Sequence, residues 1–161
     1  MINKEFTDRQ IEIMEATTLR IDKCGIQELT IKNLAADLNL SEAALYRHFK
    51  SKNEIMLGLL SYFILEMKER IDLIMVDNEK HPSEILKQIF ASQLNTFVQN
   101  PAIVSVIFAE GIFQFNKELL QKVAEMMSLM QKNIESLIDH GQNNGLYGKL
   151  LSKESITTII M

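Results

Sequence analysis

Apolar residues recur along most of the chain at the three- and four-residue spacing of α-helices, and the alternation typical of strands is almost absent. The clearest stretch spans residues 30–52. Its first apolar positions follow the i, i+3, i+4, i+7 pattern and predict one buried helix face, formed by Ile31, Leu34, Ala35 and Leu38. Thr30 stands where a side-chain oxygen can cap this helix. Asn39 follows, and asparagine tolerates the left-handed backbone of a turn.

A second short helix is predicted directly after this turn. Ser41 is its expected cap, and Leu45 and Phe49, four residues apart, are expected to face the core. The outer face then carries Glu42, Ala43, Tyr46, Arg47 and His48. Two short helices joined by a tight turn form a helix-turn-helix, whose second helix is the kind that enters the major groove of DNA.

The rest of the chain also carries helix signals, so the predicted fold class is all-α. Thr7 and Gln10 form a capping-box pattern for a first helix that is expected to end near Gly25. A long helix, apolar on more than one face, is expected from Ser51 to about Val76. Further helices are predicted from Pro82 to about Gln99, from Pro101 onward, from about Lys117 to His140, and after Ser152.

Two finer predictions concern burial. The helix from Lys117 is expected to stop at Gly141 and to turn one apolar face inward, namely Leu120, Val123, Met127, Met130, Ile134, Leu137 and Ile138. Cys24 continues the apolar line of the first helix, formed by Ile13, Met14, Thr17 and Ile21. Its thiol is therefore interpreted as buried and inert rather than as a redox sensor.

Charge changes this picture only locally. The 161 residues are 47% hydrophobic and 24% charged, with a net charge of −4, which is ordinary for a globular protein. DNA binding would therefore need a local basic patch. Such a patch lies within six residues, at Arg47, His48, Lys50 and Lys52, whereas residues 1–52 as a whole hold eight Lys or Arg against eight Asp or Glu.

The sequence lacks the motifs of several other classes of protein. It has no nucleophile elbow, no glycine-rich phosphate loop and no HExxH motif. The histidines, at 48, 81 and 140, are far apart, and a single cysteine excludes an intramolecular disulfide and a multi-cysteine metal site. We therefore expect no enzyme, no cofactor and no metal. No leader and no apolar run of the ~18 residues of a membrane span are visible, so a cytoplasmic protein without a membrane partner is expected.

The helix-turn-helix resembles that of the TetR (tetracycline repressor) family of transcriptional regulators. The matching residues are Gly25, Thr30, Leu34, Ala35, Leu38, Leu40 and Ser41, then Leu45-Tyr46-x-His48-Phe49-x-Ser51-Lys52, and Glu54. The resemblance covers roughly the first third of the chain. Two departures stand out: the family usually has glycine where this chain has Asn39, and often glycine or proline at the position of Ala43, which affects any inference about base contacts.

The resemblance implies contacts with double-stranded operator DNA. The residues implied at the DNA backbone are Thr30, Ser41, Tyr46, His48 and Lys52, since hydroxyl groups, helix-start N–H groups and cations suit phosphate oxygens. Base contacts are expected from Glu42, Ala43, Ala44 and Arg47. A glutamate can accept from cytosine N4 and an alanine methyl can pack on thymine. Two alternatives stay open: Glu42 as an acid that favours the helix dipole, and Arg47 as a ligand of phosphate rather than of guanine.

The resemblance also implies two domains, a helix-turn-helix DNA-binding domain at residues 1–50 and a helical ligand-binding and dimerisation domain at residues 51–161. The function implied is that of a homodimeric repressor that binds a palindromic operator and is released by a small apolar or aromatic effector. The expected effector pocket is lined by Phe63, Met67, Phe90, Phe108, Glu110, Phe113, Met127 and Met130. Methionine is common at permissive binding surfaces.

Alternatives remain for this second part. For each apolar pocket candidate taken singly, the favoured interpretation is a plain helix-bundle core, and for Glu110 it is a thin solvent-facing stripe. Because the segment after Ser152 ends while still apolar, the last helices of the family are interpreted as missing or incomplete, with a natural short form as the alternative. The alternative function is a helical protein–protein interaction module without sequence-specific DNA binding.

Overall fold

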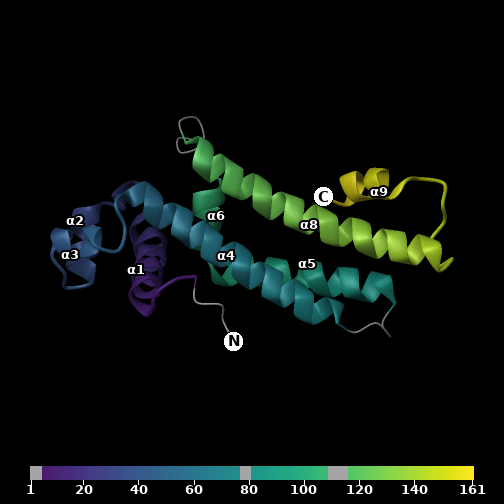
Figure 1. The fold of residues 1–161 in the computed structure, drawn as a ribbon, viewed down its shortest axis with the longest axis horizontal. Coiled ribbons are helices and arrows are strands. Elements are labelled where there is room, and N and C mark those ends of the chain that lie inside the picture. The colour runs from purple at the N-terminus through teal and green to yellow at the C-terminus, as the bar shows by residue number, and fades with distance from the viewer. Residues whose placement is uncertain (1–4, 77–80, 109–115) are drawn as a thin grey trace. The chain divides into compact units, whose positions relative to one another are not determined.

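The computed structural model describes residues 5–76, 81–108 and 116–161, and all the regular secondary structure in these ranges is helical (Figure 1). The all-α fold class is thus confirmed. In chain order the elements are α1 (Asp8–Cys24), the short 3-10 helix η1 (Ile26–Glu28), α2 (Ile31–Asp37), α3 (Glu42–Tyr46), α4 (Lys52–Met75), α5 (Pro82–Gln99), α6 (Pro101–Ile107), α8 (Lys117–Asn143) and α9 (Lys153–Ile160).

Packing divides the chain into two compact units. The first comprises Met1–Phe63 and Phe97–Lys122, and the second comprises Ile64–Thr96 and Val123–Met161. Within the first unit, α6 packs against α1 and η1, so this unit is larger than the DNA-binding head itself. The functional division at residue 50 is a different kind of boundary, and it stays a prediction.

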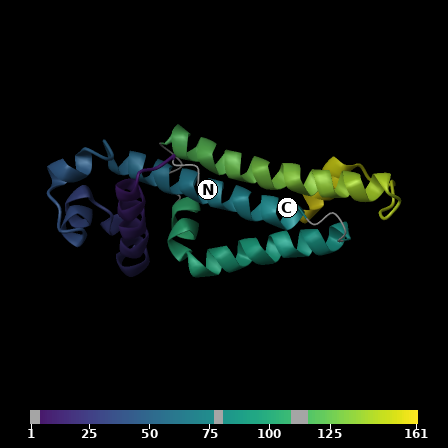
Figure 2. The same ribbon diagram turned by 60° about the horizontal axis from the view of Figure 1, so that its bottom comes forward.

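The first unit is built around α1 and the beginning of α4, beside which α2 and α3 lie (Figure 2). The predicted capping box of α1 is confirmed: the Thr7 hydroxyl accepts from the Gln10 backbone N–H at 3.2 Å, and the Gln10 side-chain oxygen accepts from the Thr7 N–H at 3.0 Å. The buried side of α1 is formed by Ile13, Met14, Thr17 and Ile21. These apolar contacts fix the scaffold on which the helix-turn-helix stands.

The end of α8 differs from the prediction. The helix does not stop at Gly141 but continues through Asn143. Gly145 has a φ of 71° and provides the left-handed residue that closes the helix. The Leu146 N–H donates to the Gly141 carbonyl at 2.8 Å and the Gly145 N–H to the Gln142 carbonyl at 3.3 Å, which is a Schellman motif. Gly141 itself is buried under the ring of Tyr147, which leaves no room there for a Cβ atom.

The inward face of α8 is also shifted at its beginning. Leu120 and Met127 are 54% and 46% exposed, whereas their neighbours Leu119 and Met126 are buried. The expected face was therefore wrong by one residue at these two positions. The physical reason is that both members of each neighbouring pair are apolar, so that periodicity alone does not select between them. From Met130 to Ile138 the expected positions Met130, Ile134, Leu137 and Ile138 are buried as predicted.

Helix α9 follows the loop after α8 and lies alongside the C-terminal part of α8 in both ribbon views (Figures 1 and 2). The predicted cap is confirmed, because the Ser152 hydroxyl accepts from the Ser155 N–H at 3.2 Å. The Lys153 ammonium contacts the Asp139 carboxylate of α8 at 3.2 Å. Among the described helices, none combines the length and the apolar character needed to cross a membrane.

Candidate nucleic-acid interface

The turn between α2 and α3 is fixed by a left-handed residue and two backbone hydrogen bonds. Asn39 has a φ of 52°, as expected for a left-handed turn residue. The Leu40 N–H donates to the Ala35 carbonyl at 2.8 Å, and the Asn39 N–H donates to the Ala36 carbonyl at 3.1 Å. These two bonds form a Schellman motif that ends α2. Helix α3 begins at Glu42, two residues after Leu40, so the angle between α2 and α3 is set within a very short stretch of chain.

Both helices have the predicted caps. The Thr30 hydroxyl accepts from the Asn33 N–H and the Ser41 hydroxyl from the Ala44 N–H, each at 3.1 Å. Thr30 and Ser41 are both exposed residues. Each cap leaves further N–H groups of the first helical turn without an intrahelical partner, and such groups favour anions.

The outer face of α3 is open to solvent, while its inner side is anchored in the core. Leu45 and Phe49 are buried, as predicted. Four candidate contact residues are exposed, namely Glu42, Ala43, Tyr46 and Arg47, with the Tyr46 side chain 47% exposed. Ala44 and His48 are half-buried. Most of the predicted DNA contacts thus lie on α3 and on the two residues that follow it.

Lys52 opens α4 and lies close to η1. Its ammonium donates to the Ile26 carbonyl at 3.4 Å, and partial burial lowers the pKa of Lys52 from its ordinary value. An ammonium has three N–H donors, so this contact leaves donors for a phosphate oxygen. The start of α4 is further ordered by Ser51, whose hydroxyl accepts from the Glu54 N–H at 3.1 Å, and by the Glu54 carboxylate, which accepts from the Lys50 N–H.

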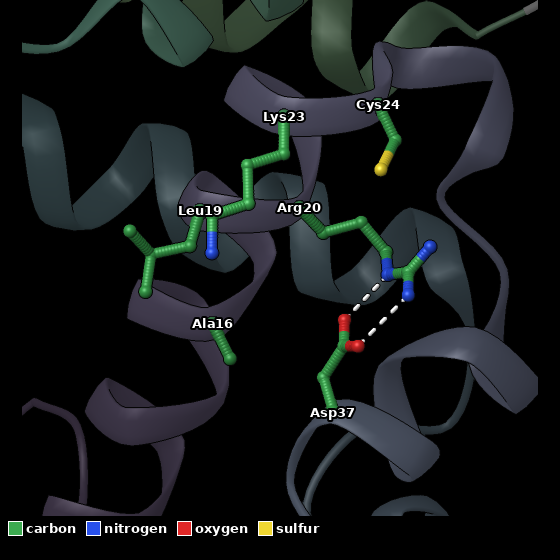
Figure 3. Close-up of a pocket in the computed structure, with 6 residues that line it drawn as sticks. All are labelled: Ala16, Leu19, Arg20, Lys23, Cys24 and Asp37. Atoms are coloured by element: carbon green, nitrogen blue, oxygen red, sulfur yellow. Dashed lines mark hydrogen bonds and ion pairs between the residues drawn. The ribbon is translucent and has the colours of Figure 1, made fainter.

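An ion pair between α1 and α2 was not predicted from the sequence. The Arg20 guanidinium donates to both carboxylate oxygens of Asp37, at 2.5 and 2.8 Å (Figure 3). The Arg20 hydrogen bonds lower the pKa of Asp37, and Asp37 in turn raises the pKa of Arg20. The two residues stand 17 positions apart, and helix periodicity carries no signal for such a pair.

Cys24 lies beside this ion pair, and the prediction that its thiol is buried was wrong. Its thiol is exposed, not buried, and lines an open surface hollow together with Ala16, Leu19, Arg20, Lys23 and Asp37 (Figure 3). Cys24 does continue the apolar line of α1. However, it is the last residue of that helix, and the packing along this line ends with Ile21.

Gln10 makes a second connection that the sequence did not reveal. Besides its part in the capping box, its side-chain N–H donates to the His48 carbonyl at 3.3 Å. This bond joins the first turn of α1 to the chain just beyond α3. The two residues are 38 positions apart, and the capping-box pattern alone gave no sign of it.

The predicted effector-pocket residues are distributed over both compact units. In the first unit, Phe63 is buried and stacks on Phe97 with ring centroids 5.8 Å apart, while Phe108 is 72% exposed. In the second, Met67 and Met130 are buried, Phe90 is half-buried and Met127 is exposed. Glu110 and Phe113 lie outside the described residues. The effector pocket therefore stays a prediction.

The geometry defines a class of protein: a helix-turn-helix head carried by a longer helical chain. Comparison with solved structures supports the same fold. A TetR transcription regulator from Haloarcula marismortui has a TM-score of 0.84 at 20% identity, covering 96% of this chain and 81% of that one. The fatty acid degradation regulator FadR from Bacillus halodurans has a TM-score of 0.79 at 16% identity, covering 98% and 80%.

Sequence comparison leads to the family. Residues 13–59 match the family model of the bacterial regulatory proteins of the tetR family. The chain is also similar to nucleoid occlusion factors SlmA, with 28% identity for the protein of Shewanella pealeana and 29% for that of Idiomarina loihiensis. Each match spans 131 residues, which is 81% of this chain and 66% of the relative, so the chain spans about two thirds of their length. Residues 13–59, which include the helix-turn-helix, thus have the sequence of the DNA-binding region of the tetR family.

This match confirms the resemblance to the TetR family that the residues between Gly25 and Glu54 indicated. It also agrees with the interpretation that the chain is not an enzyme, since the matched family model describes regulatory proteins. The matched residues 13–59 contain α2, the turn at Asn39, α3 and the start of α4, which are the elements that carry every predicted DNA contact.

Proposed function

We propose that this protein is a cytoplasmic transcriptional regulator that binds double-stranded DNA through α3. The observation that carries the proposal is the exposed outer face of α3, where Glu42, Ala43, Tyr46 and Arg47 stand on a helix whose opposite side is anchored by Leu45. Leading residues of such a helix reach base edges in the major groove, and the residues around it contact phosphates. Glu42, Ala43, Ala44 and Arg47 are assigned to the bases.

The backbone contacts follow from the caps and cations around α3. Thr30 and Ser41 offer hydroxyl and N–H groups, Tyr46 and His48 offer side-chain donors, and Lys52 offers the remaining N–H groups of its ammonium. Because the net charge of the chain is −4, attraction to DNA depends on these few groups rather than on the whole molecule.

The finer proposal concerns regulation. We infer a homodimeric repressor that binds a palindromic operator, because two copies of one head read two half-sites related by two-fold symmetry. A small apolar or aromatic effector, taken up by the helices after residue 51, shifts the dimer to a state that no longer fits the operator. A family structure in support is FadR of Thermus thermophilus in complex with lauroyl-CoA, which shares the fold at a TM-score of 0.64.

A second candidate function follows from the sequence relatives, which are nucleoid occlusion factors. Their similarity extends over 81% of this chain, well beyond the head. A role in nucleoid occlusion is therefore the alternative to the control of a gene, and it needs the same DNA-binding head.

The first experiment tests DNA binding itself. Double-stranded sequences are selected from a random library with the whole chain, and affinity for the selected and for random DNA is then measured by fluorescence anisotropy. We expect selected DNA to bind at least about 10³-fold more tightly than random DNA, as specific regulators do. No enrichment, or equal affinity for both, would contradict the proposal and favour a protein–protein interaction module.

The second experiment tests the site. Tyr46→Ala and Lys52→Ala should each weaken binding about tenfold or more, and Lys52→Ala should reduce the slope of log affinity against log salt by about 1, because one phosphate contact is lost. Lys132→Ala removes an equally positive, exposed side chain from α8 and is the matched control. Retained affinity in both head variants would show that the site is assigned wrongly.

A further inference from the structure

Gln10 uses both halves of its amide. The side-chain oxygen accepts from the Thr7 backbone N–H at 3.0 Å, which completes the capping box at the start of α1. The side-chain nitrogen donates to the His48 carbonyl at 3.3 Å. Capping boxes are formed equally well by glutamate. A glutamine is needed only for the second bond, because a carboxylate has no N–H to donate.

The accepting carbonyl lies at a sensitive place in the chain. Helix α3 ends at Tyr46, and the following turn is held by the His48 and Phe49 N–H groups, which both donate to the Leu45 carbonyl. Carbonyls beyond a helix end have no partner within the helix and carry partial negative charge. Such a group near DNA would repel phosphates unless a donor satisfied it. The Gln10 amide is that donor.

The bond also restrains three side chains of the proposed interface. They are Tyr46, Arg47 and His48, and the carbonyl that accepts from Gln10 belongs to the last of them. On the inner side the same turn is fixed by buried Phe49. The Gln10 bond thus provides a polar attachment from α1, complementary to the apolar attachment of Leu45 and Phe49.

We propose that Gln10 is a positioning residue for DNA recognition: its amide holds the end of α3 at the angle at which Tyr46 and His48 reach the DNA backbone and Arg47 reaches the bases. The proposal rests on the proposed function and adds a residue outside the helix-turn-helix to it. The role is one of positioning because the bonds of the Gln10 amide go to Thr7 and to the His48 carbonyl.

Three variants separate the two halves of the amide. Gln10→Glu keeps the acceptor for the Thr7 N–H and removes the donor to His48. Gln10→Met keeps a side chain of similar size without charge, and it removes both the acceptor for the Thr7 N–H and the donor to the His48 carbonyl. Thr7→Ala removes the hydroxyl, and with it the bonds to the Gln10 backbone N–H and to the Gln10 side-chain oxygen, but it keeps the bond from the Thr7 N–H to that oxygen and the bond to the His48 carbonyl. Melting temperature and affinity for selected and random DNA are measured for the three variants and for the parent chain.

We expect Gln10→Glu to melt within roughly 2 °C of the parent, since the capping box is retained, and to bind selected DNA roughly 3- to 10-fold more weakly, as loss of one modest hydrogen bond allows. Gln10→Met should show the same loss of affinity together with a lower melting temperature. Thr7→Ala should melt roughly 2–5 °C lower, because a cap is weakened, and should bind DNA like the parent. Loss of affinity in Gln10→Met excludes repulsion by the new carboxylate as the cause.

Three results would overturn the inference. Parent-like DNA affinity in both Gln10 variants would show that the bond to His48 is irrelevant to recognition. Loss confined to Gln10→Glu would assign the effect to charge, and an equal loss in Thr7→Ala would assign it to the cap. If the parent chain selects no DNA at all, the proposed function itself has failed. If Tyr46→Ala and Lys52→Ala bind DNA weakly while both Gln10 variants bind like the parent, the proposed function stands and the positioning role of Gln10 is wrong.

Discussion

The turn after α2 and the loop after α8 close with the same pattern of backbone hydrogen bonds but use different left-handed residues. In both, an N–H group donates to the carbonyl five residues earlier at a distance of 2.8 Å. The pairs are the Leu40 N–H with the Ala35 carbonyl and the Leu146 N–H with the Gly141 carbonyl. The left-handed residue is Asn39 in one case and Gly145 in the other. The turn at Asn39 was predicted because Asn39 is the one turn-forming residue between Leu38 and Ser41. The end of α8 was not, because two glycines, Gly141 and Gly145, stand near it and Gly141 comes first in the chain.

Packing explains why α8 passes its first glycine. The Tyr147 ring lies where a Cβ of residue 141 would be, at 2.2 Å from that position, and its hydroxyl is 2.8 Å from the Ser83 hydroxyl on α5. Gly141 is thus selected for space and Gly145 for backbone conformation. The comparison teaches that a glycine near the end of a helix has two physical uses, and that sequence alone does not distinguish them.

The largest effect is expected from the apolar anchor of α3. Leu45→Ala removes a fully buried side chain and should lower the free energy of unfolding by about 2–5 kcal/mol, because it leaves a cavity. Leu146→Ala is the matched control at the α8 loop, where the leucine is exposed, and should cost less than about 1 kcal/mol. Urea denaturation followed by circular dichroism measures both. Equal losses would mean that the two turns are anchored alike.

The next effect concerns Gly141. Gly141→Ala forces the Tyr147 ring aside and should cost about 1–3 kcal/mol through overpacking. The same change in a Tyr147→Ala background meets no ring, so it should instead stabilise the protein by up to about 1 kcal/mol, because alanine is the better helix former. A double-mutant cycle by urea denaturation gives this coupling. Additive effects would contradict the role assigned to the ring.

A smaller effect distinguishes the two left-handed residues. Asn39→Ala and Gly145→Ala should each cost about 1–2 kcal/mol, because alanine adopts a positive φ only with strain. Exchanging the residue types, Asn39→Gly and Gly145→Asn, should change the free energy of unfolding by less than about 1 kcal/mol, since both types tolerate this conformation. Thermal and urea unfolding of the four variants test this. A costly Asn39→Gly would mean that the Asn39 side chain has a role beyond the turn.

How far the sequence predicts the molecule depends on the range of each interaction. Caps at Thr7, Thr30, Ser41 and Ser152 are confirmed because a cap involves residues three positions apart. The inner face of α8 was wrong at Leu120 and Met127, since an apolar neighbour stands beside each. Periodicity also gave no indication of how far beyond Ile21 the packing of α1 extends, which is why Cys24 was misplaced.

The candidate interface divides in the same way. Its exposed residues follow from the local pattern of α3. The three contacts that hold it against the rest of the head link residues 17, 26 and 38 positions apart, namely Arg20 with Asp37, Lys52 with Ile26 and Gln10 with His48. Such contacts depend on how helices pack, and no spacing rule within one helix contains that information.

The smallest effect is expected from the Arg20–Asp37 ion pair, which is partly exposed. Hydrogen bonds from Arg20 lower the pKa of Asp37 below its value in the unfolded chain. The stabilisation is therefore complete above the unfolded pKa, near 3.9, and is lost as pH falls through the folded pKa. Asp37→Asn should cause a small loss of melting temperature at neutral pH and a shallower decline below about pH 4, whereas Glu15→Gln, on the exposed side of α1, should keep the parent's acid decline. High salt should reduce the difference at neutral pH. An unchanged acid decline in Asp37→Asn would mean that the ion pair does not contribute to folding, and that the Schellman motif at Asn39 and the caps suffice to hold α2.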